Sequence, residues 1–395
     1  MERILIFGDS FSLPRFYENT SILETRYQDT YPEFLRVLIE ESDFHTKPTL
    51  LNFSQHANNT MFLIREAPRL VSLYEPDIII IQLGLVDCWE RKPEHQAIYP
   101  ELNGKNPWIT EDEFYKNIIT FIEWCISSPY RQVKNIILCN IPRVSEDQYQ
   151  KHLGSLERTI KYNQLLEEIK KISDVFVLDM YSLYAAQDAN EILISDGIHP
   201  NQKGGQIIAG AIFNKLHEID IEGRALGVAL EIISNGQMVD GINALNSIRN
   251  NNKYSLKINY YLSLTYFEYG DVQTAQQIID ECLQNVNILF DQDYASRIYQ
   301  LKGNCFIMMN FMSSAVDSFC RSLIYNERNN EAFYQLFEIL CVYEKSEVVF
   351  DFFTKKFKVT PDKCQIISQI YTDHGQMSEG NRYIGIAHNS QGKEA

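Results

Sequence analysis

Residues 4–12 read ILIFGDSFS, in which four apolar residues are followed at once by Gly8, Asp9 and Ser10. A short run rich in Ile and Leu, without polar alternation, predicts a strand buried on both faces, as in a parallel sheet. Ligands bind such sheets at the carboxyl ends of the strands, so Ser10 is predicted to lie at the ligand edge. The turn also offers backbone N–H groups to a developing oxyanion. By itself, however, a GDS turn suits an ordinary strand end equally well.

Apolar runs of the same kind recur along the first half of the chain. Amphipathic segments separate them, and one of these opens with a capping box made by Thr110 and Glu113. Alternating strands and helices are typical of a three-layer α/β/α fold with a parallel sheet, here of five strands. The further strands are expected at residues 50–53, 78–83, 136–139 and 175–178, and the helices at 30–42, 59–74, 110 onward, 148–172 and 204–216.

Near residue 220 the strand signals stop, and helical periodicity continues alone. Small and apolar residues recur there at a spacing of 34, as in tetratricopeptide repeats, where small residues let paired helices approach closely. We therefore expect an α/β domain at residues 1–220 and an all-α repeat domain at 223–395; an irregular helical bundle is the alternative. The matched pairs are Gly236 with Gly270, Gly241 with Ala275, Leu245 with Ile279 and Ile248 with Cys282, and further copies are expected around Gly303 and Ala315, around Leu336 and Pro361, and around Gly380.

The charge balance narrows the classes of partner. The chain has 395 residues, with 36 basic and 52 acidic side chains and a formal net charge of −16. This surplus argues against nucleic acid and against insertion into or binding to an anionic membrane, because both partners attract clustered cations. No apolar run reaches the roughly 18 residues of a transmembrane helix. The apolar run at residues 4–7 is too short for the core of a signal peptide, so we expect a cytoplasmic protein. The sequence contains no metal or nucleotide motif, so we expect no cofactor and no metal.

A second motif with chemical potential is SDGIHPN at residues 195–201. An aspartate three residues before a histidine, across a glycine, can reach the imidazole and fix its tautomer. It also stabilises the imidazolium that forms on proton transfer. Asp196 and His199 are therefore predicted to form a base for a nucleophile. A structural turn with a surface histidine is the alternative, since the chain contains 8 histidines.

Together the two blocks resemble those of the SGNH (GDSL-type) hydrolase superfamily, over about residues 1–218. The resemblance implies a flavodoxin-like three-layer domain with a serine esterase site. In that site Ser10 is the nucleophile, His199 the base and Asp196 the residue that orients it.

The stretch IIIQLGLVD at residues 79–87 lies where the family has a strand followed by G-x-N-D, and Gly84 and Asp87 match that block. The family asparagine, which donates a hydrogen bond to the oxyanion, is replaced by Val86. A valine cannot donate, and loss of one such donor costs about 10²–10³ in rate in other enzymes.

A second departure concerns the block after the second predicted strand, NFSQHANNT at residues 52–60. The resemblance implies an oxyanion hole formed by the N–H groups of Ser10 and of a glycine in this block, but Ala57 or Asn58 stands in the place of that glycine. Asparagine tolerates a positive φ better than most residues. The side-chain amide of Asn58 or Asn59 is a candidate for the missing donor.

Other polar residues near these blocks are candidates for substrate binding. Each of two arginines follows a strand, where it could pair with a carboxylate or phosphate, although a solvated loop arginine is the alternative. Aromatic residues in the insertion after the third strand suit either a platform for a sugar or packing of that loop. The substrate candidates are Asp9, Asn59, Gly84, Asp87, Arg91 and Arg143, and the aromatic residues are Trp89, Tyr99 and Trp108.

These features favour an esterase that hydrolyses a small acyl group, such as acetyl, from a carbohydrate. Residues 84–91 resemble a variant block of SGNH proteins associated with bacterial surface-polysaccharide synthesis. One alternative is an acyltransferase that uses the same three residues and a sugar acceptor. Another is a weakened module that acts with the repeats as a scaffold for a protein partner, which repeat surfaces suit.

Overall fold

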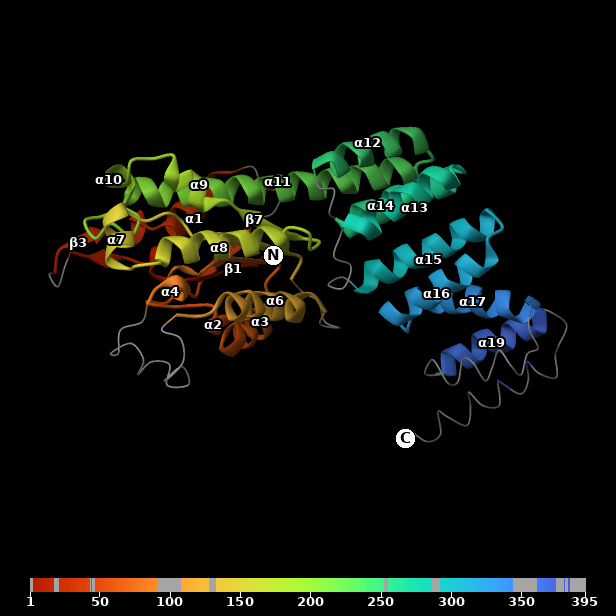
Figure 1. The fold of residues 1–395 in the computed structure, drawn as a ribbon. Helices are drawn as coiled ribbons and strands as arrows, with labels where there is room; N and C mark the ends of the chain where they lie inside the picture. The colour runs from red at the N-terminus through yellow and green to blue at the C-terminus, as the bar shows by residue number, and fades with distance from the viewer. Residues whose placement is uncertain are drawn as a thin grey trace. The chain divides into compact units, whose positions relative to one another are not determined.

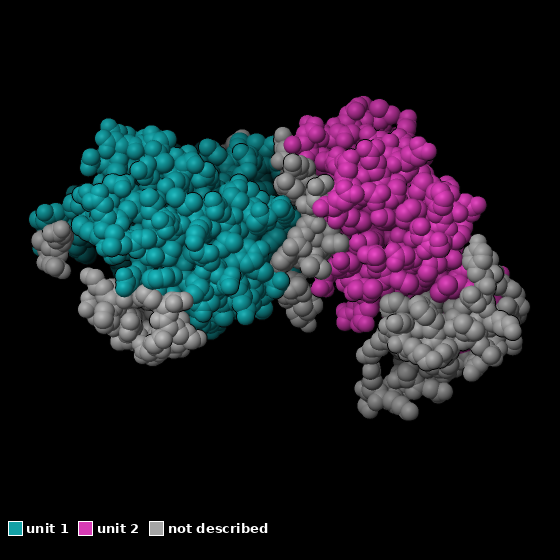
Figure 2. All heavy atoms as spheres, viewed as in Figure 1, with its two compact units in different colours: residues 1–225 teal, residues 226–395 magenta. Residues whose placement is uncertain are grey.

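The computed structural model describes residues 3–17, 21–42, 44, 47–90, 108–127, 133–251, 255–285, 292–343, 361–373, 380 and 383. The chain divides into two compact units, Met1–Ala225 and Leu226–Ala395 (Figure 2). The boundary lies within helix α11 (Gln202–Ser234), so the helix predicted at 204–216 continues past residues 220 and 223. Among the described residues, no helix has both the length and the apolar character needed to cross a membrane.

Five parallel strands form the main sheet of the first unit in the order β4-β1-β5-β6-β7, which confirms the predicted five-stranded parallel sheet. Because the winding reverses between β1 and β5, the loops that follow these two strands diverge and leave a crevice at the carboxyl edge. Ser10 follows β1 at this point. The strands are β1 (Arg3–Gly8), β4 (Thr49–Asn52), β5 (Ile78–Gln82), β6 (Asn135–Cys139) and β7 (Val175–Leu178).

Helices cover both faces of the sheet, with α1, α9 and α11 on one side and α2, α3 and α6 on the other (Figure 1). The residues of β1 from Ile4 to Phe7 are fully buried between these layers, as a strand without polar alternation requires. The helices other than α11 are α1 (Tyr31–Glu41), α2 (Met61–Arg65), α3 (Ala67–Tyr74), α4 (Leu85–Cys88), α6 (Glu111–Ser127), α7 (Glu146–Lys151), α8 (Ser155–Ile169), α9 (Met180–Ala185) and α10 (Ala189–Ile192).

Two segments predicted as single helices are each broken into two. The break between α2 and α3 precedes Pro68, which has no N–H to continue the helical hydrogen bonds. The break between α7 and α8 ends at Gly154, whose φ of 75° is left-handed. A small hairpin, β2 (Arg15–Phe16) with β3 (Leu23–Thr25), was not expected from the sequence because its strands are only two and three residues long.

The second unit is helical throughout its described residues, as the sequence predicts. Gly270 ends α13 with a φ of 94°, and α14 begins two residues later. A Cβ on Gly303 of α15 would lie 2.6 Å from the ring of Phe319 in α16, so only glycine allows this close approach. Pro361, which is matched to one of the repeat copies, begins α19. The helices are α12 (Met238–Asn251), α13 (Leu256–Tyr269), α14 (Val272–Asn285), α15 (Gln292–Met308), α16 (Met312–Tyr325), α17 (Asn330–Tyr343) and α19 (Pro361–Asp373).

Candidate active site

Ser10 begins the short 3-10 helix η1 (Ser10–Ser12), directly after β1. Asp9 caps this turn, because its Oδ1 accepts a hydrogen bond of 3.0 Å from the N–H of Phe11. Gly8 is required at the end of the strand, since a Cβ there would lie 2.5 Å from the Oγ of Ser12 and 2.6 Å from that of Ser54. The close packing around Gly8 therefore holds the turn, and with it the Ser10 hydroxyl, at the carboxyl edge of the sheet.

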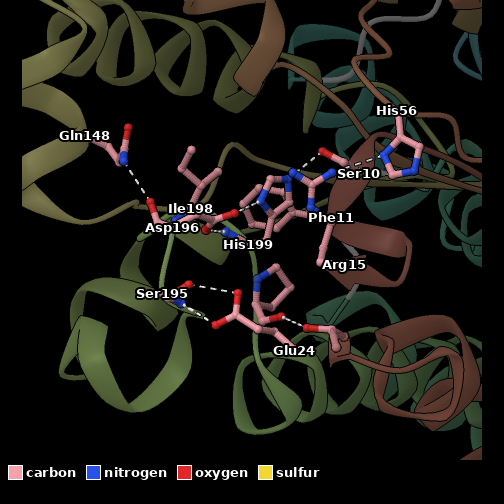
Figure 3. Close-up of polar contacts among 12 residues, drawn as sticks. Ser10, Phe11, Arg15, Glu24, His56, Gln148, Ser195, Asp196, Ile198 and His199 are labelled. Carbon is pink, nitrogen blue, oxygen red and sulfur yellow. Dashed lines mark hydrogen bonds and ion pairs between the residues drawn. The ribbon is translucent and has the colours of Figure 1, made fainter. Parts of the chain in front are cut away.

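The loop at residues 195–200 brings an imidazole to this hydroxyl. His199 Nε2 lies 2.7 Å from Ser10 Oγ, and His199 Nδ1 lies 2.6 Å from Asp196 Oδ2 (Figure 3). Asp196 also holds its own loop, because its Oδ1 accepts hydrogen bonds from the N–H groups of Ile198 and His199, at 2.8 and 3.0 Å. Gly197 makes the turn with a φ of 70°, which favours glycine. The structure thus joins the two sequence motifs in one line of hydrogen bonds.

Burial and the contact between His199 and Asp196 shift the pKa values of both residues. His199 is only 6% exposed, and burial lowers its pKa below the ordinary value of 6.5, although the carboxylate of Asp196 partly opposes this. Burial acts in the opposite direction on Asp196, but the hydrogen bonds from His199 and its charge outweigh it and lower the pKa of Asp196. A neutral imidazole beside an ionised carboxylate can accept a proton from a serine hydroxyl at neutral pH.

Two backbone N–H groups near Ser10 remain available for an oxyanion. Within the part of the chain that the structure describes, the N–H groups of Ser10 and Ala57 donate no hydrogen bond. Ala57 has a φ of 55°, so it adopts the left-handed conformation expected of the family glycine. The N–H of Asn58 is directed elsewhere, to the carbonyl of Gln55 at 3.3 Å. Of the two alternatives left open by the sequence, Ala57 has the suitable geometry.

The side chain of Asn58 does not supply a further donor, which corrects that expectation for Asn58. Asn58 Nδ2 donates to the carbonyl of Gly8 at 3.1 Å and so ties the loop to β1. Asn59 is fully buried, and its Nδ2 lies out of reach of solvent without a partner. The Asn58 amide is therefore engaged elsewhere in this conformation.

Asp9, Asn59, Gly84 and Asp87, which are expected to contact substrate, are all buried. Asp87 accepts hydrogen bonds from the N–H and the Oγ1 of Thr60, so it links two loops beneath the site. Gly84 has a φ of 124° and packs against Ile141. Burial raises the pKa of Asp9 to about 7. These residues therefore belong to the buried packing around the site.

The remaining candidates for substrate binding are two arginines and three aromatic residues. Arg143 lies on the loop after β6, where it is 3.7 Å from Glu146, and it lines neither of the hollows described below. Trp89 stacks on His152 at 4.3 Å, and Arg158 lies 4.3 Å above the ring of Trp108, so packing is favoured over a sugar platform. Arg91 and Tyr99 lie outside the described residues.

A hollow of about 460 Å³ borders Asp196, and its polar lining was not predicted from the motifs. The hairpin β2–β3 contributes Arg15 and Glu24, and the loop after β4 contributes His56 (Figure 3). Glu24 accepts hydrogen bonds from the N–H and Oγ of Ser195, at 3.3 and 2.8 Å. A second hollow, of about 270 Å³, lies on the other side of the same loop and includes Ser145 and Gln148.

A doubly wound parallel sheet with a Ser–His–Asp line at its carboxyl edge defines a class of α/β serine hydrolases. The family model for the GDSL-like lipase/acylhydrolases matches residues 6–207, and the chain belongs to this family. No curated protein matches the sequence.

Solved structures of similar fold include esterases. The lipase/acylhydrolase from Enterococcus faecalis is 18% identical over 55% of this chain and 95% of its own, with a TM-score of 0.42. An acetylxylan esterase from Geobacillus stearothermophilus is 18% identical over 54% of this chain and 93% of its own, with a TM-score of 0.39.

Proposed function

We propose that the first unit is a serine esterase that hydrolyses small acyl esters through an acyl-enzyme on Ser10. The observation that carries the proposal is the unbroken line of hydrogen bonds from Ser10 Oγ through His199 to Asp196. Ser10 is partly exposed, so an ester can approach it, whereas the two partners are held by their loop.

The reaction takes place in two steps. Ser10 Oγ attacks the acyl carbon while its proton passes to His199 Nε2, and the carbonyl oxygen becomes an oxyanion near the N–H groups of Ser10 and Ala57. The intermediate then expels the alcohol, which takes the proton from His199. Water, deprotonated by His199, next attacks the acyl-enzyme and releases the carboxylic acid together with the free serine.

The lining of the hollows supports a small acyl group on a hydroxyl-rich alcohol. The larger hollow has Arg15, Glu24, His56 and Ser195 as hydrogen-bonding groups beside the apolar rings of Pro14 and Phe16. A long acyl chain would require a mainly apolar groove, whereas a sugar suits a mixed surface. We propose an O-acetylated carbohydrate as substrate, in the metabolism of a bacterial surface glycan.

The experiment compares the parent protein with Ser10→Ala on a small aryl acetate and on acetylated oligosaccharides. Ser12→Ala is the matched control, because Ser12 lies in the same turn but is 1% exposed and donates to the hydroxyl of Tyr31. We expect Ser10→Ala to abolish hydrolysis of both substrates and Ser12→Ala to retain it. Equal rates in the parent and Ser10→Ala would overturn the esterase proposal and favour a binding module.

A further inference from the structure

The oxyanion hole lacks the side-chain donor that the family pattern provides at residue 86. Val86, which is partly buried after β5, has no polar atom. Asn58 is engaged with Gly8, and the amide nitrogen of Asn59 is buried. Two backbone N–H groups alone would leave the developing charge less stabilised than in a site with three donors, by a factor of about 10²–10³ in rate.

Arg15 comes from a different part of the chain and lines the hollow that borders Asp196. Its side chain extends from β2 towards Ser10 and His56 (Figure 3), and its Nη1 lies 3.3 Å from His56 Nδ1. His56 immediately precedes Ala57, whose N–H is one of the two available donors. The hydrogen bond to His56 therefore holds the guanidinium group at the residue that precedes Ala57, and within the described residues the other N–H groups of this fork have no partner.

The charge of Arg15 also acts on the reacting groups. His56 is kept neutral because burial and then the charge of Arg15 lower its pKa, so its Nδ1 can accept the hydrogen bond from Arg15. Burial is the largest cause of the lowered pKa of His199, and Asp196 acts in the opposite direction. The charge of Arg15 also lowers this pKa. Within the described residues Arg15 forms no ion pair with a carboxylate. A cation whose field reaches the imidazole base is well placed to stabilise negative charge formed at Ser10.

We propose that Arg15 donates a hydrogen bond to the oxyanion, in place of the asparagine that Val86 replaces. The inference rests on the proposed esterase function. In the first step Ser10 Oγ bonds to the acyl carbon, its proton moves to His199, and the carbonyl π electrons move to the oxygen. That oxygen is then held by the N–H groups of Ser10 and Ala57 and by the guanidinium of Arg15, until it re-forms the carbonyl and the alcohol leaves with the proton. Because the charge exists only during the reaction, Arg15 acts on kcat rather than on substrate binding.

The test measures kcat and KM for a small, neutral aryl acetate with Arg15→Gln and Arg15→Lys. Arg69→Gln is the matched control, because Arg69 undergoes the same change of charge on α3, where its side chain is 73% exposed. We expect Arg15→Gln to lower kcat by about 10²-fold or more, with KM within about twofold of the parent value. Arg15→Lys should lower kcat less, because lysine keeps the positive charge. Arg69→Gln should match the parent, and equal thermal unfolding of all variants excludes a folding defect.

A rescue variant makes the test specific for the missing donor. Adding Val86→Asn to the Arg15→Gln protein should recover at least about tenfold of the lost kcat, because an amide then stands where the family has one. The proposal is overturned if Arg15→Gln retains the parent kcat on the aryl acetate. A parent-like kcat on both substrate types, with a rise in KM confined to sugar acetates, would also overturn it, because Arg15 would then act only as a contact for the sugar. Failure of the esterase proposal is distinguishable, since the parent and Ser10→Ala would then hydrolyse the aryl acetate at equal rates.

Discussion

In the proposed mechanism, the protonation state of His199 controls the reaction. His199 has to be neutral to accept the proton of Ser10, and burial lowers its pKa while Asp196 limits that effect. The three residues of this line could be predicted because each lies in a short motif next to a strand end or a glycine turn. Arg15 and His56 could not, because they meet only after a hairpin of two very short strands has formed.

The protonation of His199 predicts the acidic limb of the activity profile. Because the pKa of His199 in the folded protein is below 6.5, kcat/KM should stay high at neutral pH and fall with a midpoint below pH 6.5 as the imidazole gains a proton. The measurement is kcat/KM for a neutral aryl acetate between about pH 4 and 9. A midpoint at or above pH 7 would contradict the assignment of a buried, neutral base.

At the scale of elements, the loop after β4 shows what motif reading can and cannot provide. The sequence could place an oxyanion donor at residue 57 or 58, but choosing between them required the backbone, in which Ala57 has a φ of 55°. The side chain of Asn58 was also expected to donate to the oxyanion, but its amide instead donates a hydrogen bond to the carbonyl of Gly8. The helix breaks at Pro68 and Gly154 have local causes, yet a periodic apolar pattern continues across both and hides them.

The strain at Ala57 predicts that Ala57→Gly is more stable than the parent. A left-handed conformation costs an L-residue about 1–2 kcal/mol, of which the greater flexibility of unfolded glycine offsets about 0.5–1 kcal/mol. We expect an increase of about 0.5–1 kcal/mol in the free energy of unfolding by urea, with esterase activity retained because the N–H remains. Glu75→Gly, at a φ of 47° at the end of α3, is a control at a similar angle remote from the reaction. A less stable Ala57→Gly protein would refute the argument.

At the scale of the whole molecule, the α/β unit and the helical unit differ in how well they could be predicted. Buried apolar runs specify the order of strands and helices, so the parallel sheet follows from the sequence. The units divide at Ala225 and Leu226, close to the limit expected from the sequence, but the division lies inside the continuous helix α11, which the pattern of apolar residues does not reveal. That the helical unit forms tetratricopeptide-like repeats and binds a protein partner stays a prediction.

The close contact at Gly303 predicts a change confined to the helical unit. In Gly303→Ala the new Cβ would overlap the buried ring of Phe319, and overpacking of this kind costs about 1–3 kcal/mol. We expect a lower unfolding temperature for the helical unit and an unchanged kcat on an aryl acetate at 25 °C. The control Gly227→Ala, on an exposed stretch of α11 with no neighbour within 4 Å, should gain stability of about 0.5–1 kcal/mol from helix propensity. Loss of kcat in Gly303→Ala would contradict this independence.

The central claim is that Ser10 is the nucleophile and that His199 activates it. The most direct measurement is covalent labelling with a fluorophosphonate, followed by mass spectrometry of the peptide that contains Ser10. The account predicts one adduct, on Ser10, and a strongly reduced rate of labelling in His199→Ala. An adduct on another residue, or no adduct in a preparation that still hydrolyses an aryl acetate, would contradict it.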